Sequence, residues 1–132
     1  MGRARPFDRS KPPIALIVED DPAVREIAAV LFEESDLRVI TCDNAEKAFA
    51  KLCQHGAETV LVFADVRLAG LMDGVDLAHR VRRMWPHIKV ILTSGHPNSA
   101  SDLPAEVEYL AKPWLALDLL VQAEKASVAR SR

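Results

Sequence analysis

Acidic, hydroxyl and ammonium side chains stand where short apolar runs of this sequence end. Carboxylates follow the first and third runs, hydroxyls stand at the end of the fourth, and a lysine follows the fifth. If these runs are strands of one parallel sheet, the groups that follow them lie together beyond the carboxyl ends of the strands. They are Glu19, Asp20, Asp21, Asp65, Thr93, Ser94 and Lys112.

This cluster of carboxylates needs a cation. Carboxylates that lie close together repel one another and resist ionisation unless a positive charge joins them. A set of oxygen ligands without Cys or His suits a hard ion, so we expect Mg²⁺ or Mn²⁺ rather than Zn²⁺. The Thr93 hydroxyl and the Lys112 ammonium are groups that bind phosphoryl oxygens. Because an aspartate can accept a phosphoryl group as an aspartyl-phosphate, the residues predict a Mg²⁺-dependent phosphoryl acceptor.

Five apolar runs alternate with segments of helical spacing. The runs predict strands that are buried on both faces. They are Ile14–Val18, Arg38–Cys42, Thr59–Ala64, Ile88–Thr93 and Val107–Ala111. Strands that alternate with helices form right-handed crossover units, and these build a parallel sheet covered on both faces. We therefore predict an α/β fold, a doubly wound five-stranded parallel sheet.

Local signals predict where the helices begin and end. Asp21 precedes Pro22, which is typical of an N-cap followed by proline at the first helical position. We therefore interpret Asp21 as a cap rather than as a metal ligand. Asp43 and Glu46 have the spacing of a capping box, and Gly56 can end the helix that follows.

The last helical segment carries more leucines than one face needs. Leu117, Leu120 and Val121 form the stripe that we expect to face the core, whereas Leu115 and Leu119 lie off it. Two interpretations stay open. The segment is either a wide core-facing helix with a few exposed leucines, or it presents a face to a partner or to a second copy of the chain, a homodimer.

Composition limits the class of protein. The chain has 132 residues, of which 49% are hydrophobic, which fits one domain with a core. A net charge of −2 argues against direct nucleic-acid binding. No apolar run approaches the ~18 residues of a membrane span, and no signal-peptide core follows the basic start of the chain. We expect a cytoplasmic protein with a flexible tail over residues 1–13, a domain over 14–127 and a short tail over 128–132.

The remaining chemistry-bearing residues are expected to be ordinary. Cys42 and Cys53 are too few for a disulfide framework and are interpreted as small buried thiols. The histidines lack metal-ligand spacing and are expected at the surface. They are His55, His79, His87 and His96. Of these, His96 lies in the loop after Thr93 and is the one that can border the site.

Four sequence motifs, in this order and spacing, resemble the receiver domain of two-component response regulators. They are IALIVEDDPAVR, LVFADVRLAGLMDGVDLA, VILTSGH and EYLAKPW. Each motif is weak alone, but four in order are specific, and the resemblance covers roughly residues 14–127. It implies a flavodoxin-like sheet of strand order 2-1-3-4-5. It also implies a switch rather than an enzyme, a protein that catalyses only its own phosphorylation and dephosphorylation.

The resemblance implies a metal site around the phosphorylated residue. Asp65 would accept the phosphoryl group and would also bind Mg²⁺. Asp20 would bind the ion directly and Glu19 through water. The backbone carbonyl of Arg67 would complete the protein ligands.

The resemblance also implies how the phosphoryl group would be held and sensed. Thr93 would donate a hydrogen bond to it, and Lys112 would pair with it, directed by a cis peptide to Pro113. Tyr109 would be the switch aromatic, which moves inward once Thr93 is drawn to the phosphate.

Four features depart from the family pattern. Ala69 replaces a usual proline, so we expect a looser loop after Asp65. That loop, Arg67 to Gly74, is about one residue longer than most. The Arg67 side chain borders the path of the hydrolytic water and is expected to alter the phosphate lifetime. The span from Thr93 to Lys112 is short, so we expect the fourth helix of the family to be stunted or mobile.

The expected partners are a histidine kinase or histidine phosphotransfer protein and a downstream target protein. Whether the chain is a stand-alone receiver or a receiver cut from a hybrid kinase stays open. One alternative is a phosphorylation-independent interaction module, against which the complete set of site residues argues. A Mg²⁺-dependent phosphatase would require a second Asp two residues after Asp65, where this chain has Arg67.

Overall fold

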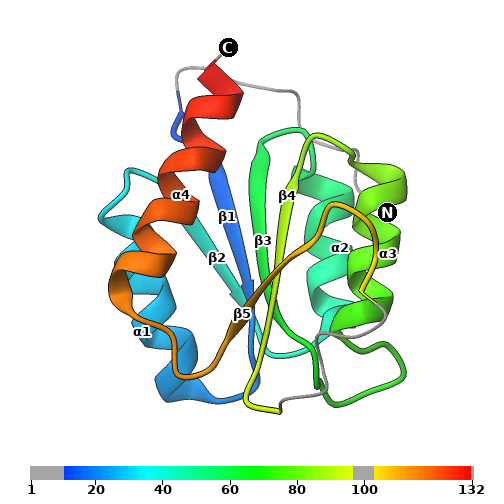
Figure 1. The fold of residues 1–132 in the computed structure, drawn as a ribbon. Coiled ribbons are helices and arrows are strands. Elements are labelled where there is room, and N and C mark those ends of the chain that lie inside the picture. Colours follow the sequence, from blue (N-terminus) through cyan, green and yellow to red (C-terminus); the bar gives the residue numbers. More distant parts are fainter. Residues whose placement is uncertain (1–10, 97–102, 132) are drawn as a thin grey trace.

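Five parallel strands form one sheet between two layers of helices (Figure 1). This computed structural model describes residues 11–96 and 103–131. The strands are β1 (Ile14–Val18), β2 (Arg38–Cys42), β3 (Thr59–Asp65), β4 (Lys89–Ser94) and β5 (Glu108–Ala111). The helices are α1 (Pro22–Glu33), α2 (Ala45–His55), α3 (Gly74–Met84) and α4 (Ala116–Ser131). The strand order is β2-β1-β3-β4-β5, which confirms the predicted fold and the order implied by the resemblance.

Side chains of alternate strand residues fill two cores, one on each face of the sheet. Helices α1 and α4 cover one face, and α2 and α3 cover the other (Figure 1). On the α1/α4 face, Phe63 of β3 meets Phe32 of α1 edge to face, with ring centroids 5.7 Å apart. Every residue of β1 and β3 is buried, as expected for central strands of a parallel sheet. Burial of each large apolar side chain there contributes about 1.5–3 kcal/mol to the free energy of folding.

Acidic N-caps begin α1 and α3. The Asp21 carboxylate accepts a hydrogen bond of 2.9 Å from the amide of Ala23, and Pro22 opens α1, so the predicted cap is confirmed. At the start of α3, Asp73 and Asp76 each accept a hydrogen bond from the other's backbone amide. This capping box was not predicted from the sequence.

The start of α2 corrects one prediction. Asn44, not Asp43, is the N-cap, because the Asn44 side chain accepts a 2.8 Å hydrogen bond from the amide of Lys47. Asp43 lies one residue too early and pairs with the Lys47 ammonium at 3.0 Å. Gly56 does cap the other end, but with an ordinary helical backbone. A Cβ at Gly56 would lie 2.3 Å from the Trp85 indole nitrogen, so the glycine makes room for Trp85.

The buried face of α4 also differs from the predicted stripe. Leu119 is fully buried, and with it Ala123 and Ala126, whereas Leu117 is 66% exposed and Val121 is 39% exposed. These three buried apolar residues are spaced as i, i+4 and i+7, and they pack toward α1 and β3. The prediction failed because it counted large apolar residues, and two of these three buried apolar residues are alanines.

Three further expectations concern segments at the edge of the described structure. Residues 1–10 of the predicted flexible tail and residues 97–102 of the predicted stunted helix lie outside the described residues. The described parts of the β4–β5 connection, residues 95–96 and 103–107, contain no helix. Helix α4 runs on to Ser131, so the predicted C-terminal tail is helical as far as that residue.

The cysteines and histidines are described by their exposure. Cys42 is buried as predicted, but Cys53 is exposed, which corrects the expectation of two buried thiols. Cys53 lies on the outer side of α2, whose inner side is formed by small and apolar residues. Three histidines are exposed and His55 is half-buried. Within the described residues, none of the helices is both long enough and apolar enough to cross a membrane.

Candidate phosphoryl-acceptor site

The period of the strands brings the predicted site residues to one face. Glu19, Asp65 and Thr93 each lie two residues after an apolar residue of the α1/α4 core, so their side chains share that face at the carboxyl end of the sheet. The apolar residues are Ile17, Phe63 and Ile91. Asp65 and Thr93 are direct partners in the register of β3 and β4.

Lys112 joins this group from the end of β5. Its amide donates a 2.9 Å hydrogen bond to the carbonyl of Ser94, which extends the pairing of β5 with β4. Its ammonium lies 2.7 Å from Glu19 Oε1 and 2.7 Å from Asp65 Oδ2. The peptide between Lys112 and Pro113 is cis, as the resemblance implies.

Three carboxylates form a cluster that fits a hard cation. Glu19, Asp20 and Asp65 each offer an oxygen atom, and these atoms lie within 4.8 Å of one another. Glu19 and Asp65 are buried, whereas Asp20 is exposed. Lys112 supplies one positive charge against three negative charges, so the cluster keeps a negative excess. All three donors are oxygen atoms, the type that Mg²⁺ prefers in proteins.

Burial and hydrogen bonds within the cluster shift the pKa values of two groups. Burial raises the pKa of Glu19, and the nearby charge of Asp65 raises it further, although the hydrogen bond from Lys112 opposes this. Burial lowers the pKa of Lys112, but its hydrogen bonds to Asp65 and Glu19 outweigh burial and leave this pKa above its usual value. Lys112 is therefore charged at neutral pH. The pKa of Glu19 is raised, and a second cation beside it would oppose this shift by favouring the ionised form.

The loop after β3 holds the other oxygen of Asp65. The amide of Arg67 donates a 2.9 Å hydrogen bond to Asp65 Oδ1, and the Arg67 side chain is exposed. The amide of Gly74 donates to the carbonyl of Val66 at 3.0 Å. A Cβ at Gly74 would lie 2.1 Å from the Asp65 carbonyl oxygen, so the loop returns close against Asp65. That the Arg67 carbonyl binds metal stays a prediction.

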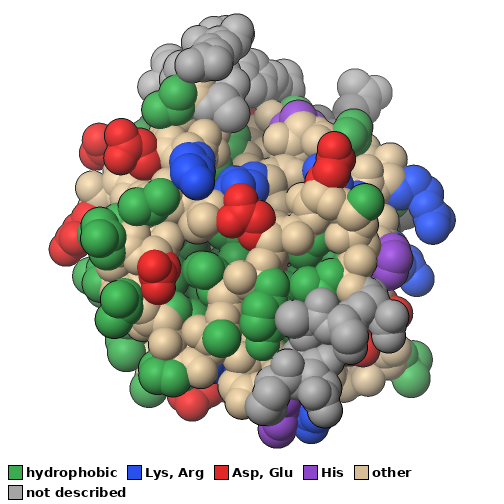
Figure 2. Space-filling model, viewed as in Figure 1, with side chains coloured by type: hydrophobic (Ala, Val, Ile, Leu, Met, Phe, Trp, Pro, Cys, Tyr) green, Lys and Arg blue, Asp and Glu red, His purple; other side chains and the backbone are tan. Residues whose placement is uncertain are grey.

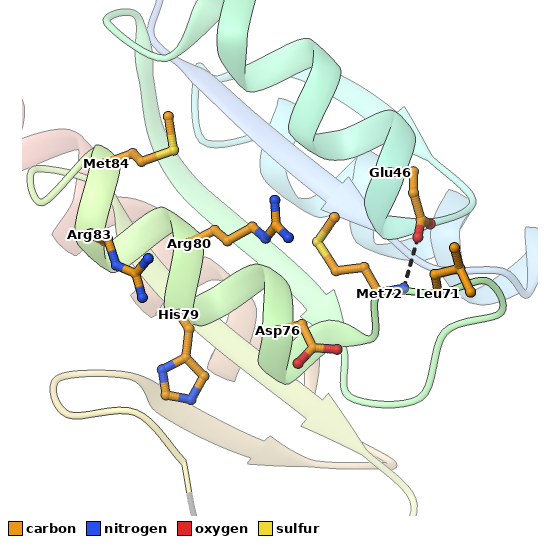
Figure 3. A pocket seen from close by; sticks show the side chains of 8 residues that line it. All are labelled: Glu46, Leu71, Met72, Asp76, His79, Arg80, Arg83 and Met84. Carbon is orange, nitrogen blue, oxygen red and sulfur yellow. Dashed lines mark hydrogen bonds between the residues drawn. The ribbon is translucent and has the colours of Figure 1, made fainter.

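A hydrogen bond to helix α2 fixes the far end of the same loop (Figure 3). Glu46 Oε2 accepts a 2.8 Å hydrogen bond from the amide of Met72. Gly70 has a φ of 109°, a conformation that favours glycine, and it lies beside the Glu46 carboxylate. A groove of about 700 Å³ runs from this point along α3, past Asp76 and Arg80. None of the residues that line it belongs to the carboxylate cluster.

Thr93 is buried and has a partner that sequence reasoning missed. The indole Nε1 of Trp114 donates a 3.1 Å hydrogen bond to Thr93 Oγ1. The same indole meets the Phe63 ring edge to face, with centroids 5.7 Å apart. The available signal was an indole, which is a hydrogen-bond donor, placed two residues after Lys112.

Tyr109 lies on the opposite face of the sheet from Thr93. It packs against the α2/α3 core, and its hydroxyl lies 3.2 Å from the carbonyl oxygen of Ser94 and 3.4 Å from that of His96. The described contacts of His96 in this loop are made by its backbone, including a 3.0 Å hydrogen bond from its amide to Ser94 Oγ. That Tyr109 moves as a switch stays a prediction.

An apolar hollow borders the site on the side of α1. It has a volume of about 490 Å³ and is lined by Val24, Ile27, Lys112, Pro113 and Trp114. Figure 2 shows hydrophobic side chains gathered among charged ones on the α1 and α4 side of the molecule. Ile27 is 54% exposed there. Because Lys112 lines the hollow and also contacts Glu19 and Asp65, the cluster of carboxylates adjoins an apolar surface.

Comparison with known sequences identifies relatives of the chain. The model of the response regulator receiver domain matches residues 15–123. The response regulator receiver protein CpdR of Brucella abortus is 29% identical over 118 residues, which cover 86% of this chain and 96% of CpdR. The transcriptional regulatory protein AruR of Pseudomonas aeruginosa is 33% identical over 120 residues, 85% of this chain and 48% of AruR. The matched region covers only 25% of NtrX from Azorhizobium caulinodans.

Solved structures of the same fold are also similar. A response regulator receiver protein from Sinorhizobium medicae superimposes with a TM-score of 0.81 at 22% identity, over 92% of this chain and 98% of that one. The receiver domain of NtrX from Brucella abortus has a TM-score of 0.73 at 26% identity, over 86% of this chain and 98% of that domain. Because the family model matches most of its length, this chain belongs to the response regulator receiver domain family.

Proposed function

We propose that this protein is a phosphoacceptor that takes a phosphoryl group onto Asp65 in the presence of Mg²⁺. The donor is a histidine kinase or a histidine phosphotransfer protein, and the phosphorylated form signals through a changed protein-binding surface. The observation that carries the proposal is the position of Lys112. Its ammonium lies 2.7 Å from both Glu19 and Asp65, where it can neutralise charge on the acceptor and on the incoming group.

The chemical step is a transfer between two atoms. An oxygen of the Asp65 carboxylate forms a bond to phosphorus as the bond from phosphorus to the donor histidine nitrogen breaks, and that nitrogen keeps the electron pair. Lys112 then pairs with one phosphoryl oxygen, and the Thr93 hydroxyl donates a hydrogen bond to another. The Arg67 amide already holds Asp65 Oδ1 at 2.9 Å, which orients the carboxylate for attack.

The metal has a defined place in this proposal. Glu19, Asp20 and Asp65, with the backbone carbonyl of Arg67, would hold Mg²⁺. When bound, Mg²⁺ neutralises negative charge on the phosphoryl oxygens. The oxygen-only donor set and the negative excess of the cluster support this assignment.

Loss of the phosphoryl group is expected to depend on Arg67. Its side chain is exposed two residues after Asp65, where it would border the path of a water molecule to phosphorus. We propose that Arg67 alters the lifetime of the phosphorylated form. A decay rate of the Arg67→Ala phosphoprotein equal to that of the wild type would refute this.

The signalling role follows from the family. Receiver domains of response regulators interact with kinases and downstream effectors, and they are not enzymes in the usual sense. We propose that Thr93 and Tyr109 link the phosphoryl group to the surface that the effector reads. Exposed Leu115, just before α4, and exposed Leu117 on α4 offer an apolar surface to a partner protein or to a second copy of the chain. A cytoplasmic location belongs to the proposal, because ATP-derived phosphoryl groups are available there.

The test is the mass of the intact protein after incubation with acetyl phosphate and Mg²⁺. We expect one phosphoryl adduct on the wild type, and none on Asp65→Asn or in the presence of EDTA. Circular dichroism establishes that each variant is folded. A folded wild type that takes up no phosphoryl group from acetyl phosphate, phosphoramidate or a phosphorylated phosphotransfer protein would overturn the proposal. It would favour the alternative, a phosphorylation-independent interaction module.

A further inference from the structure

The Thr93 hydroxyl is held by a side chain outside the carboxylate cluster. Thr93 is 1% exposed, and its Oγ1 accepts the 3.1 Å hydrogen bond from Trp114 Nε1. Trp114 comes from the connection between β5 and α4, and Thr93 comes from β4. The bond therefore joins two segments that both end at the acceptor site.

The chemistry of the two groups fixes the direction of this hydrogen bond. An indole N–H can only donate, so the oxygen of Thr93 must accept. A hydroxyl has one proton, and that proton cannot be donated to Trp114. It stays available to an acceptor elsewhere, and the register partner of Thr93 on β3 is Asp65. Trp114 thus favours rotamers of Thr93 in which the hydroxyl proton is free to serve a phosphoryl oxygen.

The indole is itself fixed by packing. Its ring meets the Phe63 ring edge to face at 5.7 Å, and Phe63 meets Phe32 of α1 in the same way. Phe63 precedes Asp65 by two residues on β3, and Lys112 precedes Trp114 by two residues. The Trp114 side chain therefore contacts Phe63 on the strand of Asp65 and the hydroxyl of Thr93, and it belongs to the segment that carries Lys112.

We propose that Trp114 is a positioning residue for the phosphoryl acceptor, because its indole N–H holds the Thr93 hydroxyl as a donor for a phosphoryl oxygen. This inference rests on the proposed function of Asp65. Trp114 does not touch the reacting atoms, and the proposed effect is exerted through Thr93.

The first test replaces Trp114 by Phe. This change keeps an aromatic ring against Phe63 and removes the N–H. The initial rate of phosphoryl uptake from acetyl phosphate, followed by intact mass, is expected to fall about three- to tenfold, the effect of one neutral hydrogen bond. The matched control is Trp85→Phe, since Trp85 packs on Phe49 at the end of α3, away from the cluster. The control is expected to take up the phosphoryl group at the wild-type rate.

A second background separates positioning from a merely structural role. In a Thr93→Ala chain the hydroxyl is absent, so adding Trp114→Phe is expected to change the uptake rate no further. A Thr93→Ser chain keeps the hydroxyl. In that chain, adding Trp114→Phe is again expected to lower the uptake rate. Thermal unfolding of each variant, without phosphoryl donor, gives the stability against which the rates are compared.

The outcomes distinguish the inference from the function on which it rests. An adduct on the wild type with an unchanged rate in Trp114→Phe would overturn the role of Trp114 and leave the role of Asp65 intact. An equal fall in the wild-type and Thr93→Ala backgrounds would also overturn it, because Trp114 would then act through packing alone. The absence of any adduct on the folded wild type would overturn the proposed function and this role together.

Discussion

The ammonium of Lys112 reaches the carboxylate of Asp65 across an intervening strand. Lys112 follows β5 and Asp65 ends β3, and β4 lies between them in the sheet. The two side chains nevertheless meet at 2.7 Å. Thr93, at the end of β4, is the register partner of Asp65, so hydroxyl, carboxylate and ammonium come from three adjacent strands. The fold thereby places a cation beside the carboxylate that we propose as the acceptor of a negatively charged phosphoryl group.

Removal of this ammonium is expected to separate phosphoryl uptake from metal binding. Lys112→Met should lower the rate of uptake about ten- to a hundredfold, because a charge-assisted hydrogen bond to the incoming group is lost. Binding of Mg²⁺ should persist or tighten, since the ammonium no longer neutralises Asp65 and Glu19. Intact mass with acetyl phosphate measures the first effect, and the rise in melting temperature with Mg²⁺ measures the second. Lys47→Met, which alters an exposed lysine, is the control, and wild-type uptake by Lys112→Met would contradict the prediction.

A side chain at Gly74 is expected to displace the acceptor. A Cβ there would lie 2.1 Å from the Asp65 carbonyl oxygen and 2.9 Å from the Asp65 carbonyl carbon, and neither backbone atom can move without a shift of the strand end. We expect Gly74→Ala to lower the free energy of unfolding by about 1–3 kcal/mol, as overpacking does, and to slow phosphoryl uptake.

Gly95→Ala is the matched control for this change. Among the described residues, no heavy atom lies within 4 Å of a Cβ at Gly95, so urea unfolding should give a free energy close to that of the wild type. A Gly74→Ala protein as stable as Gly95→Ala, with unchanged uptake, would show that the loop can accommodate the methyl group.

The polar ends of the strands could be predicted because a simple rule governs them. Buried parallel strands appear as continuous apolar runs, and the first polar residue after each run lies at the carboxyl edge of the sheet. This rule found Glu19, Asp65 and Lys112, and the structure brings all three together. The predicted strand ends agree with the observed ends within one residue for the same reason.

The features that were missed depend on tertiary packing or on competition between neighbours. The hydrogen bond from Trp114 to Thr93 depends on the path of the connection between β5 and α4. No local sequence pattern predicts that path. The buried face of α4 uses Ala123 and Ala126, which pack closely without a strong apolar signal. At the start of α2, Asp43 and Asn44 both have side chains suited to an N-cap. Asn44 is the N-cap because the helix begins at Ala45.

Glu46 is expected to hold the loop after Asp65 against α2. The loop has alanine rather than proline at residue 69, which favours mobility, but the 2.8 Å hydrogen bond from the Met72 amide to Glu46 opposes it (Figure 3). Glu46→Ala should lower the free energy of unfolding by about 1 kcal/mol. It should also speed hydrogen exchange of the Met72 amide, measured by NMR. Lys47→Ala, at the neighbouring position, should leave that exchange rate unchanged. Equal exchange rates in the two variants would argue against a role of Glu46 in holding the loop.

Glu108 is expected to make stability depend on pH on the acid side. Its Oε1 accepts a 2.7 Å hydrogen bond from Lys89, and its Oε2 accepts one of 2.7 Å from Gln122. The hydrogen bond from Lys89 is the main cause that lowers the pKa of Glu108 below its usual value of 4.5, although partial burial opposes it. A carboxyl whose pKa is lower in the folded state stabilises the fold above the unfolded pKa. This contribution is lost as the pH falls through the folded pKa.

Replacement of Glu108 by Gln should therefore matter near neutral pH and not in acid. The Glu108 side chain is 42% exposed, so solvent screening limits the loss of unfolding free energy to about 1 kcal/mol at most. The difference between Glu108→Gln and the wild type should shrink as the pH falls below about 4.5 and vanish below the folded pKa. Urea unfolding at a series of pH values measures it. In a Lys89→Met background the difference at neutral pH should be smaller, because the partner that lowers the pKa is gone. A difference that stays constant with pH would instead assign the effect to packing of the Glu108 side chain.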